Sequence, residues 1–421
     1  MTQETAGKAP KRAIYATYAA GLFGNGLTDM MNVAVPLWAL TLGASATEIG
    51  IIVGARNVLP LFLAIHGGVL MDRMGTRRVM FFFAAMATAL APLYPALPWL
   101  PALVVLQMFI GLATILTWVG AQTLIVQLTG GDTTHLGRFT FVTRFGTFSG
   151  PILIGVMWDL WGEWGAFTFA GVWGLGLLAS IRLIPDPKSA AAMAPPALRA
   201  RDLVPRVSEY VRSFALLGLP AVALAVGISL LRSTTSGIQD SFYVVYLQQA
   251  GMTGTTIGAL IAMVEISSGL GSLTAGQVAR FMRPHWALIG FSILAVSLIA
   301  ITPLLGAVFA VLALVQLLRG GCQGLILPII LSSVSKAVGP GNQGRAMGLR
   351  MTGNRLAATI IPVIMGVIAD AVGVGNSFFI VGGVVIGLLF VTALLVHRSG
   401  AFAGPPGTGT EAPMAKQDGA G

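Results

Sequence analysis

Several polar and ionisable residues interrupt long apolar segments of this chain. A charged group at the centre of a bilayer costs ~2.5 to 3.5 kcal/mol on insertion scales, so each one needs a partner or a water-filled cavity. A carboxyl in such a place can take up a proton when it is dehydrated and release it when water enters, because burial disfavours its charged form. The residues that could move a proton or contact a polar solute in this way are Asp29, Arg56, Gln107, Arg232, Asp240, Glu265, Gln316 and Arg319.

Asp29 is the first candidate for a proton carrier, since it lies near the middle of its apolar segment. A structural salt bridge to Arg56 on the neighbouring segment is the alternative. In the second half of the chain, Asp240 and Glu265 occupy the corresponding pair of segments. Their expected counterions are Arg232 and Arg319.

The composition indicates which kind of element must position these residues. Of the 421 residues, 55% are apolar and only 10% are charged, whereas an ordinary soluble domain carries ~25% charged residues. The net charge of +10 would suggest nucleic acid only if the basic residues clustered on a soluble face, and their placement does not fit this. We therefore expect an integral membrane protein whose partner is the lipid bilayer, not nucleic acid.

The sequence also excludes several kinds of site. Cys322 is the single cysteine, so disulfides and cysteine-based zinc sites are excluded. No lysine follows a GxxxxG pattern and no HExxH helix is present, so neither a nucleotide-binding P-loop nor a zinc-peptidase helix is predicted. We expect no metal, no cofactor and no enzymatic activity.

Twelve apolar runs have the ~20 residues that a helix needs to cross a bilayer. Charges, turns or clusters of Pro and Gly bound each run, and each is predicted to be a transmembrane α-helix. The seventh is too long for one straight span, so a helix on the membrane surface is expected at its start. The predicted spans are 14–42, 49–71, 79–97, 102–128, 139–160, 166–184, 216–249, 257–279, 286–305, 307–335, 346–372 and 377–396.

The links between these spans alternate in charge. Every Lys and Arg outside the spans lies in a terminal segment or in every second link. The charged residues of the other links are all acidic, for example Glu48 and Asp159. Cytoplasmic loops collect Lys and Arg, so both termini are predicted to be cytoplasmic, with the chain in the plasma membrane, or the inner membrane of a bacterium. The predicted order is a cytoplasmic N-terminus at 1–13, a six-helix bundle at 14–184, a cytoplasmic linker at 185–213, a second six-helix bundle at 214–397 and a disordered cytoplasmic tail at 398–421.

The two halves repeat one another at an offset near 210 residues. Asp29 aligns with Asp240 at an offset of 211, and Glu265 takes the position of Asn57 at 208. Gln107 and Gly111 likewise fall on Gln316 and Gly320. An ordered series of such matches predicts two pseudo-symmetric halves. Arg144 and Arg355, also related by the repeat, are candidates for an inner gate, with snorkelling or substrate contact as alternatives.

The link after the second span reads GVLMDRMGTRR and resembles the loop signature of the major facilitator superfamily, GxxxDRxGxRR. The resemblance extends to the twelve spans and implies that family's fold: an all-α integral membrane protein with two six-helix halves and a binding site between them. It implies a cytoplasmic latch, in which the acidic residue lies near the start of the eleventh span, where a helix N-terminus attracts negative charge. An ordinary positively charged loop is the alternative. The implied gating residues are Gly68, Asp72, Arg73, Gly75, Arg77 and Arg78.

The fifth span carries a second pattern, in which two glycines form a GxxxG face for close helix packing and a proline weakens the helical hydrogen bonds nearby. It resembles the antiporter motif of proton-coupled exporters in the same superfamily, and so implies export. Tight packing without bearing on direction is the alternative. One departure from these exporters is Gln107, which stands where many of them carry an Arg. The residues of the fifth-span motif are Gly137, Gly146, Gly150, Pro151 and Gly155.

These features predict a secondary active transporter that works by alternating access, as a proton-coupled antiporter exporting small amphipathic organic compounds. Six arginines against three acids within the spans favour a substrate with an anionic group. An uptake symporter or facilitator for an organic anion is the alternative within the same fold. A membrane sensor that does not transport is the alternative of another class. We expect the protein to function as a monomer.

Overall fold

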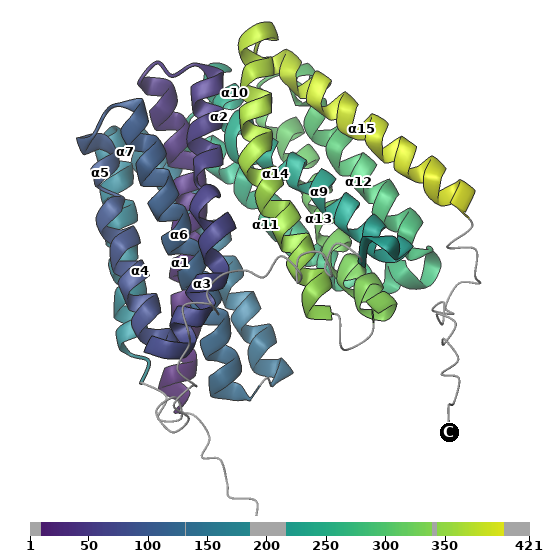
Figure 1. Ribbon diagram of the computed structural model, residues 1–421. Helices are drawn as coiled ribbons and strands as arrows, with labels where there is room; N and C mark the ends of the chain where they lie inside the picture. Colours follow the sequence, from purple (N-terminus) through teal and green to yellow (C-terminus); the bar gives the residue numbers. More distant parts are fainter. Residues whose placement is uncertain (1–9, 131, 186–215, 339–342, 400–421) are drawn as a thin grey trace, which may run out of the picture.

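The computed structural model describes residues 10–130, 132–185, 216–338 and 343–399. Within these ranges the regular elements are all helices, arranged as two bundles that lie side by side (Figure 1). The helices of the first half, purple to blue, form one bundle, and those of the second half, teal to yellow, form the other. Most of the predicted linker and all of the predicted tail beyond Ser399 lie outside the described residues.

In the part of the chain that the structure describes, the first bundle contains seven helices, and two of the predicted spans are merged in the last of them. The non-helical backbone of Gly162 (φ 63°, ψ −155°) divides this helix. Phe139 and Ile181, from its two ends, belong to one buried cluster, so the chain turns back at Gly162. The helices are α1 (Lys11–Thr41), α2 (Ala46–Ala55), α3 (Val58–Met74), α4 (Thr76–Leu90), α5 (Leu93–Ala96), α6 (Leu100–Thr129) and α7 (Thr133–Arg182).

The second bundle has a similar order of helices, but its first span, unlike α1, is interrupted. A π-helical turn, η4, separates two α-helical segments, so the long seventh span is one interrupted helix. The elements are η3 (Leu216–Gly218), α9 (Pro220–Ile238), η4 (Gln239–Tyr243), α10 (Val244–Gln249), α11 (Gly254–Phe281), α12 (Pro284–Ala300), η5 (Thr302–Leu304), α13 (Phe309–Val338), α14 (Gln343–Val372) and α15 (Val374–Ser399).

Each of the twelve predicted spans corresponds to helical structure, which confirms the predicted fold class. Seven described segments are long and apolar enough to cross a bilayer by length and composition alone, and one of them, Thr134–Arg182, holds two predicted spans. Others fall short in length, as do the 15 residues of α4, whereas α1 is long but misses the apolar criterion. The predicted boundaries differ by a few residues; α1, for example, begins at Lys11 instead of residue 14.

Helix starts follow from side chains that accept bonds from the first free backbone N–H groups. At α2, the Ser45 hydroxyl accepts from the Glu48 N–H (3.2 Å) while the Glu48 carboxylate accepts from the Ser45 N–H (2.8 Å). At α7, Asp132 accepts from the N–H groups of His135 and Thr134, and these bonds hold the pKa of its carboxyl below the ordinary value. At these two helices the link residues therefore fix where the helix begins.

The two bundles share one buried core and each has another of its own. The shared core includes Ile49 and Ile154 from the first half with Ile257 and Met365 from the second. We call the end of the molecule that carries Glu48, Asp159, Glu163 and Asp370 the acidic end. The opposite end, with Arg73, Arg138, Arg182, Arg280 and Arg283, is the basic end.

Candidate functional site

The two halves are joined at the acidic end by two aspartates, each at the start of a helix in the opposite half. Asp159 of α7 accepts from the N–H groups of Gly254 and Thr255 (both 2.7 Å) and from the Thr255 hydroxyl (2.6 Å). Asp370 of α14 accepts from the N–H groups of Ala46 (2.8 Å) and Thr47 (2.9 Å). A carboxylate at a helix N-terminus satisfies free donors and complements the helix dipole. Both contacts obey the internal repeat.

Glycines allow the same helix pairs to approach closely below these caps. A Cβ placed on Gly258 would lie 2.0 Å from the carbonyl oxygen of Pro151, and one on Gly50 would lie 2.2 Å from that of Pro362. Distances this short exclude any larger residue without movement of the backbone. The α7–α11 and α2–α14 contacts therefore close the acidic end, and the repeat relates one to the other.

Two arginines reach across the interface deeper in the molecule. Arg144 of α7 forms an ion pair with Glu265 of α11. Arg355 of α14 donates to the side-chain oxygen of Asn57 (2.9 Å) at the break between α2 and α3. The sequence repeat aligns Arg144 with Arg355 and Glu265 with Asn57, so the two pairs are equivalent in position and different in charge.

The first half adds a hydrogen-bonded chain on the same side as Asn57. Arg56 donates to the side-chain oxygen of Asn32, and the Asn32 amide donates to Asp29 (3.3 Å). Asn32 thus stands between the acid and the arginine, where a direct salt bridge was the alternative. Sequence reasoning missed Asn32, although its place one turn after Asp29 was a usable signal.

Further charges of the second half lie within electrostatic range of this chain. Asp240, in the π-helical turn η4, is close enough to interact with Arg56 and Arg319. Asp29 is close enough to interact with Glu265 and Asp240. The structure therefore gathers the three acids of the predicted site around the interface between the halves. π-Helical turns of this kind are frequent at functional sites.

Of the expected counterions of the second half, Arg319 is close enough to interact with Asp240, whereas Glu265 forms its ion pair with a different arginine. Glu265 pairs with Arg144 of the other half, not with Arg232 or Arg319. Arg319 is completely buried and donates to Gln239, the neighbour of Asp240, while its Nε and Nη1 atoms have no hydrogen-bond partner among the described residues. Gln107 and Gln316 are also buried, each with one unpartnered amide atom in the described part of the chain.

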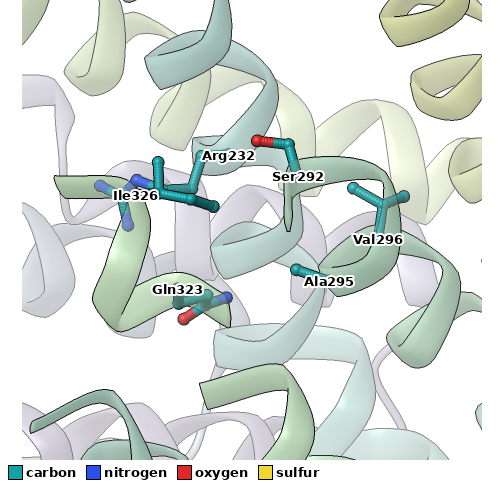
Figure 2. A pocket seen from close by; sticks show the side chains of 6 residues that line it. All are labelled: Arg232, Ser292, Ala295, Val296, Gln323 and Ile326. Carbon is teal, nitrogen blue, oxygen red and sulfur yellow. The ribbon is translucent and has the colours of Figure 1, made fainter. Parts of the chain in front are cut away.

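Arg232 is close enough to interact with Glu265 and Asp240, but it forms no ion pair with either among the described residues. It lines a small pocket inside the second half, between α9, α12 and α13 (Figure 2). Its neighbours there are uncharged, so the pocket supplies polar groups but no carboxylate. The lining residues are Arg232, Ser292, Ala295, Val296, Gln323 and Ile326.

The predicted cytoplasmic latch can be followed only in part. Gly75 has a positive φ (90°) and separates α3 from α4, as a tight link requires. Arg77 donates to the carbonyl oxygens of Ile181 (3.3 Å) and Arg182 (3.1 Å) at the end of α7, within its own half. Arg73 and Arg78 are exposed. The surroundings of Gly68 and Asp72 lie outside the described residues, so the latch stays a prediction.

The residues of the fifth-span motif divide between two partners. A Cβ on Gly146 would lie 2.0 Å from the carbonyl oxygen of Leu22 in α1, and one on Gly150 would lie 2.7 Å from that of Gly26. Pro151 and Gly155 face α11, whereas a Cβ on Gly137 would meet nothing within 4 Å. The motif packs α7 against its own half and against the other half.

The described contacts between the halves gather toward the acidic end. Among the described residues, hydrogen bonds between the halves extend from the acidic end no further than Arg144–Glu265 and Arg355–Asn57. Beyond these pairs, Phe141 of α7 is 67% exposed and Leu273 of α11 is 80% exposed. No group of three or more potential metal ligands occurs in the described ranges. The arrangement suits the binding and release of a solute between two halves.

A family model decides the class of protein. The model described as "Major Facilitator Superfamily" matches residues 18–238 and 225–417, nearly the whole chain. The chain belongs to the Major Facilitator Superfamily. It is therefore a multi-pass membrane protein of a transporter family, with the twelve-span architecture that the sequence predicted.

Curated relatives within this superfamily are similar along almost their full length. The enterobactin exporter EntS of Salmonella typhi is 25% identical over 406 residues, which cover 91% of this chain and 92% of the relative. EntS of Citrobacter koseri is 24% identical over 425 residues, covering 96% and 95%.

Solved structures show the same fold at lower identity. A mutant of the nucleoside transporter NupG superposes with a TM-score of 0.77 at 14% identity, covering 91% of this chain and 99% of that one. A bacterial homolog of the human lysosomal transporter Spinster gives 0.74 at 13% identity, covering 94% and 98%.

Proposed function

We propose that this member of the superfamily is a proton-coupled antiporter that exports small amphipathic organic compounds by alternating access. The observation that carries the proposal is the set of charged contacts between the halves: the Asp29–Asn32–Arg56 chain and the Arg144–Glu265 pair. Such contacts can form and break as the halves move, and can change strength with protonation. The names of the relatives, enterobactin exporters, support the export direction.

Asp29 is the proposed proton carrier. Its described hydrogen bond comes from a neutral amide, so it can gain or lose a proton without separating an ion pair. Glu265, in contrast, is held by Arg144. The closed acidic end and the intact Arg144–Glu265 pair fit a state in which protons have left and the substrate enters from the basic side. Protonation on the opposite side would then return the emptied carrier.

Inside-out vesicles with an imposed pH gradient test this proposal. The screen includes enterobactin, which the relatives' names identify as their cargo, and other amphipathic compounds. We expect gradient-driven accumulation by the native chain. Asp29→Asn should still exchange substrate but lose accumulation against a gradient. Gradient-driven accumulation by Asp29→Asn would exclude Asp29 as the sole carrier.

The direction of flux separates this proposal from its alternatives. Uptake symport of an organic anion is favoured by one observation, the excess of arginines over acids in the spans. It would appear as gradient-driven loss of solute from the same vesicles. A sensor that does not transport would bind a compound without any flux. We further propose that no cofactor is needed, that a proton gradient supplies the energy and that a monomer suffices.

The proposed orientation places the basic end, both termini and the central linker in the cytoplasm. Single cysteines at Glu163 and Asn376, in a Cys322→Ala background, should react with an impermeant thiol reagent added outside cells. A cysteine at Lys188 in the linker should not. Reaction of the linker cysteine alone would reverse the orientation.

A further inference from the structure

The two arginine pairs between the halves occupy equivalent places but leave different amounts of charge. Arg144 faces a carboxylate, Glu265, which neutralises it. Arg355 faces the amide of Asn57, which accepts a hydrogen bond and carries no charge. An unneutralised guanidinium at this depth is costly unless an anion or a polar lining compensates it.

The Asn57 amide is fixed in this role by two bonds to α14. Its oxygen accepts from Arg355 (2.9 Å) and its Nδ2 donates to the carbonyl oxygen of Ala358 (3.4 Å). This pair of bonds sets which side of the amide faces the arginine. Asn57 therefore orients Arg355 while leaving its positive charge available.

A second cation stands next to the first. Arg56 precedes Asn57 at the break between α2 and α3, and its described partner is again an amide, that of Asn32. Arg56 and Arg355 act on one another as like charges. Asp29, through Asn32, and Asp240 both act on Arg56, whereas no acid among the described residues acts on Arg355. Arg355 is therefore the guanidinium on this side of the interface whose charge no described carboxylate offsets.

Neither arginine is fully buried. Their side chains are partly exposed, and they lie where the contacts between the halves end. Gly111 lets α6 pack closely against the break between α2 and α3, since a Cβ on Gly111 would lie 1.9 Å from the carbonyl oxygen of Arg56. The Arg56 backbone is thus backed by a neighbouring helix.

We propose that Arg355 and Arg56, oriented by Asn57 and Asn32, form a binding subsite for a carboxylate or similar anionic group of the transported compound. The guanidinium fork suits bidentate pairing with such a group. The equivalent place at Arg144 is already filled by Glu265, so the transporter binds the anionic group on the α2–α14 side only. This inference rests on the proposed transport function for its substrate.

Equilibrium binding to the purified protein in detergent, without any gradient, tests the subsite. The probes share one apolar body and differ in charge: 1-naphthoate, 1-naphthamide and a naphthylmethyl trimethylammonium salt. Asn57→Asp would place a carboxylate against Arg355, as Glu265 stands against Arg144. We expect it to weaken 1-naphthoate binding by about tenfold, the size of a lost charge-assisted hydrogen bond. Amide binding should change by less than about twofold.

Two further variants keep the test decisive. Arg355→Gln should weaken naphthoate binding to a similar extent, and Asn57→Ser, which adds no charge, should weaken it less than Asn57→Asp does. Equal losses for naphthoate and naphthamide would overturn the subsite, as would unchanged binding in both Asn57→Asp and Arg355→Gln. A loss confined to Arg319→Gln would also overturn it, because the anion would then bind at Arg319.

The binding test and the vesicle test fail independently. If gradient-driven export is absent but Asn57→Asp selectively weakens naphthoate binding, the subsite stands and the coupling proposal falls. If export proceeds while naphthoate binding is indifferent to Arg355 and Asn57, the subsite falls and the proposed function stands.

Discussion

The α7–α11 and α2–α14 contacts are equivalent under the internal repeat. They are alike at the acidic end and differ deeper in the interface. At the acidic end both use an aspartate cap and a glycine against a proline carbonyl. Deeper in the interface, one copy has a continuous helix with Glu265 and the other has a broken helix with Asn57. The shared layer closes the molecule mechanically, whereas the layer that differs carries the charge asymmetry. The contacts that obey the repeat thus close the acidic end, and the contacts that depart from it determine the charge available between the halves.

The largest effect is expected where the shared layer is broken on both sides at once, in Gly50→Ala with Gly258→Ala. Each added methyl group would meet a backbone carbonyl at 2.2 or 2.0 Å, so the helices must separate. Overpacking costs ~1–3 kcal/mol per site, which shifts the ratio of closed to open acidic end by about tenfold or more. Spin labels at Thr41→Cys and Ala371→Cys, in a Cys322→Ala background, measure this opening.

Two glycines with room for a methyl group give matched controls for this variant. Gly269 lies on α11, as Gly258 does, and Gly137 lies on α7, which packs against α11; a Cβ on either would meet nothing within 4 Å. Gly137→Ala with Gly269→Ala should leave the label distances unchanged. If the Gly50 and Gly258 variants behave like this control, close packing does not hold the acidic end shut.

A smaller opening is expected from Asp159→Asn with Asp370→Asn. The amide oxygens still accept a hydrogen bond, but the negative charge at each helix N-terminus is lost. Loss of a cap costs ~0.5–2 kcal/mol. Loss of both caps should change the ratio of the closed to the open population by about tenfold, measured by the same spin labels. Glu163→Gln removes an acid of the same end that makes none of the described bonds between the halves, and it should have no effect. Opening by Glu163→Gln alone would point to net charge instead of capping.

The sequence alone was sufficient for the fold and for the positional equivalences within the site. Apolar length predicted the twelve spans, and the repeat aligned Arg144 with Arg355 and Glu265 with Asn57 before any contact was known. Pairing across the halves could not be predicted in this way, because it depends on how two bundles pack. Glu265 was therefore matched with arginines of its own half, and its partner is Arg144.

The break at Arg56–Asn57 and the π-helical turn at Asp240 also escaped sequence reasoning. Pro60 removes the hydrogen bond to the carbonyl of Arg56, four residues earlier, and was a usable signal for the first break. No proline lies near Asp240, so local propensity predicts a continuous helix there. Asn32 was overlooked for a related reason: a single amide in an apolar helix gains meaning only when both neighbours, Asp29 and Arg56, are seen to bond to it. The π-helical turn and the bonds of Asn32 depend on tertiary contacts that a single sequence does not reveal.

Glu265→Gln makes the asymmetric layer symmetric and is expected to change affinity severalfold. Arg144 would then face an amide, as Arg355 does, and its charge would become available to a solute. The pair is partly exposed, with 44% of the Arg144 side chain and 28% of the Glu265 side chain accessible, so solvent screens it. A gain of about threefold in 1-naphthoate affinity follows from ~0–1 kcal/mol for such pairs. Unchanged or weaker naphthoate binding, with naphthamide binding intact, would show that Glu265 does not set the asymmetry.

The smallest effect is expected from Thr255→Val at the Asp159 cap. The Thr255 hydroxyl donates to Asp159 at 2.6 Å, but the N–H groups of Gly254 and Thr255 remain as donors when it is removed. Because the site is exposed, the loss should be ~0.5 kcal/mol, or about a twofold shift in the closed population measured by the same spin labels. Thr256→Val is the matched control, since its hydroxyl bonds to the Thr253 carbonyl within its own helix start and not to the other half. A Thr255→Val effect as large as that of Asp159→Asn would mean that the hydroxyl, and not the helix N-terminus, holds the aspartate. The difference between the two caps would then lie in their threonine side chains.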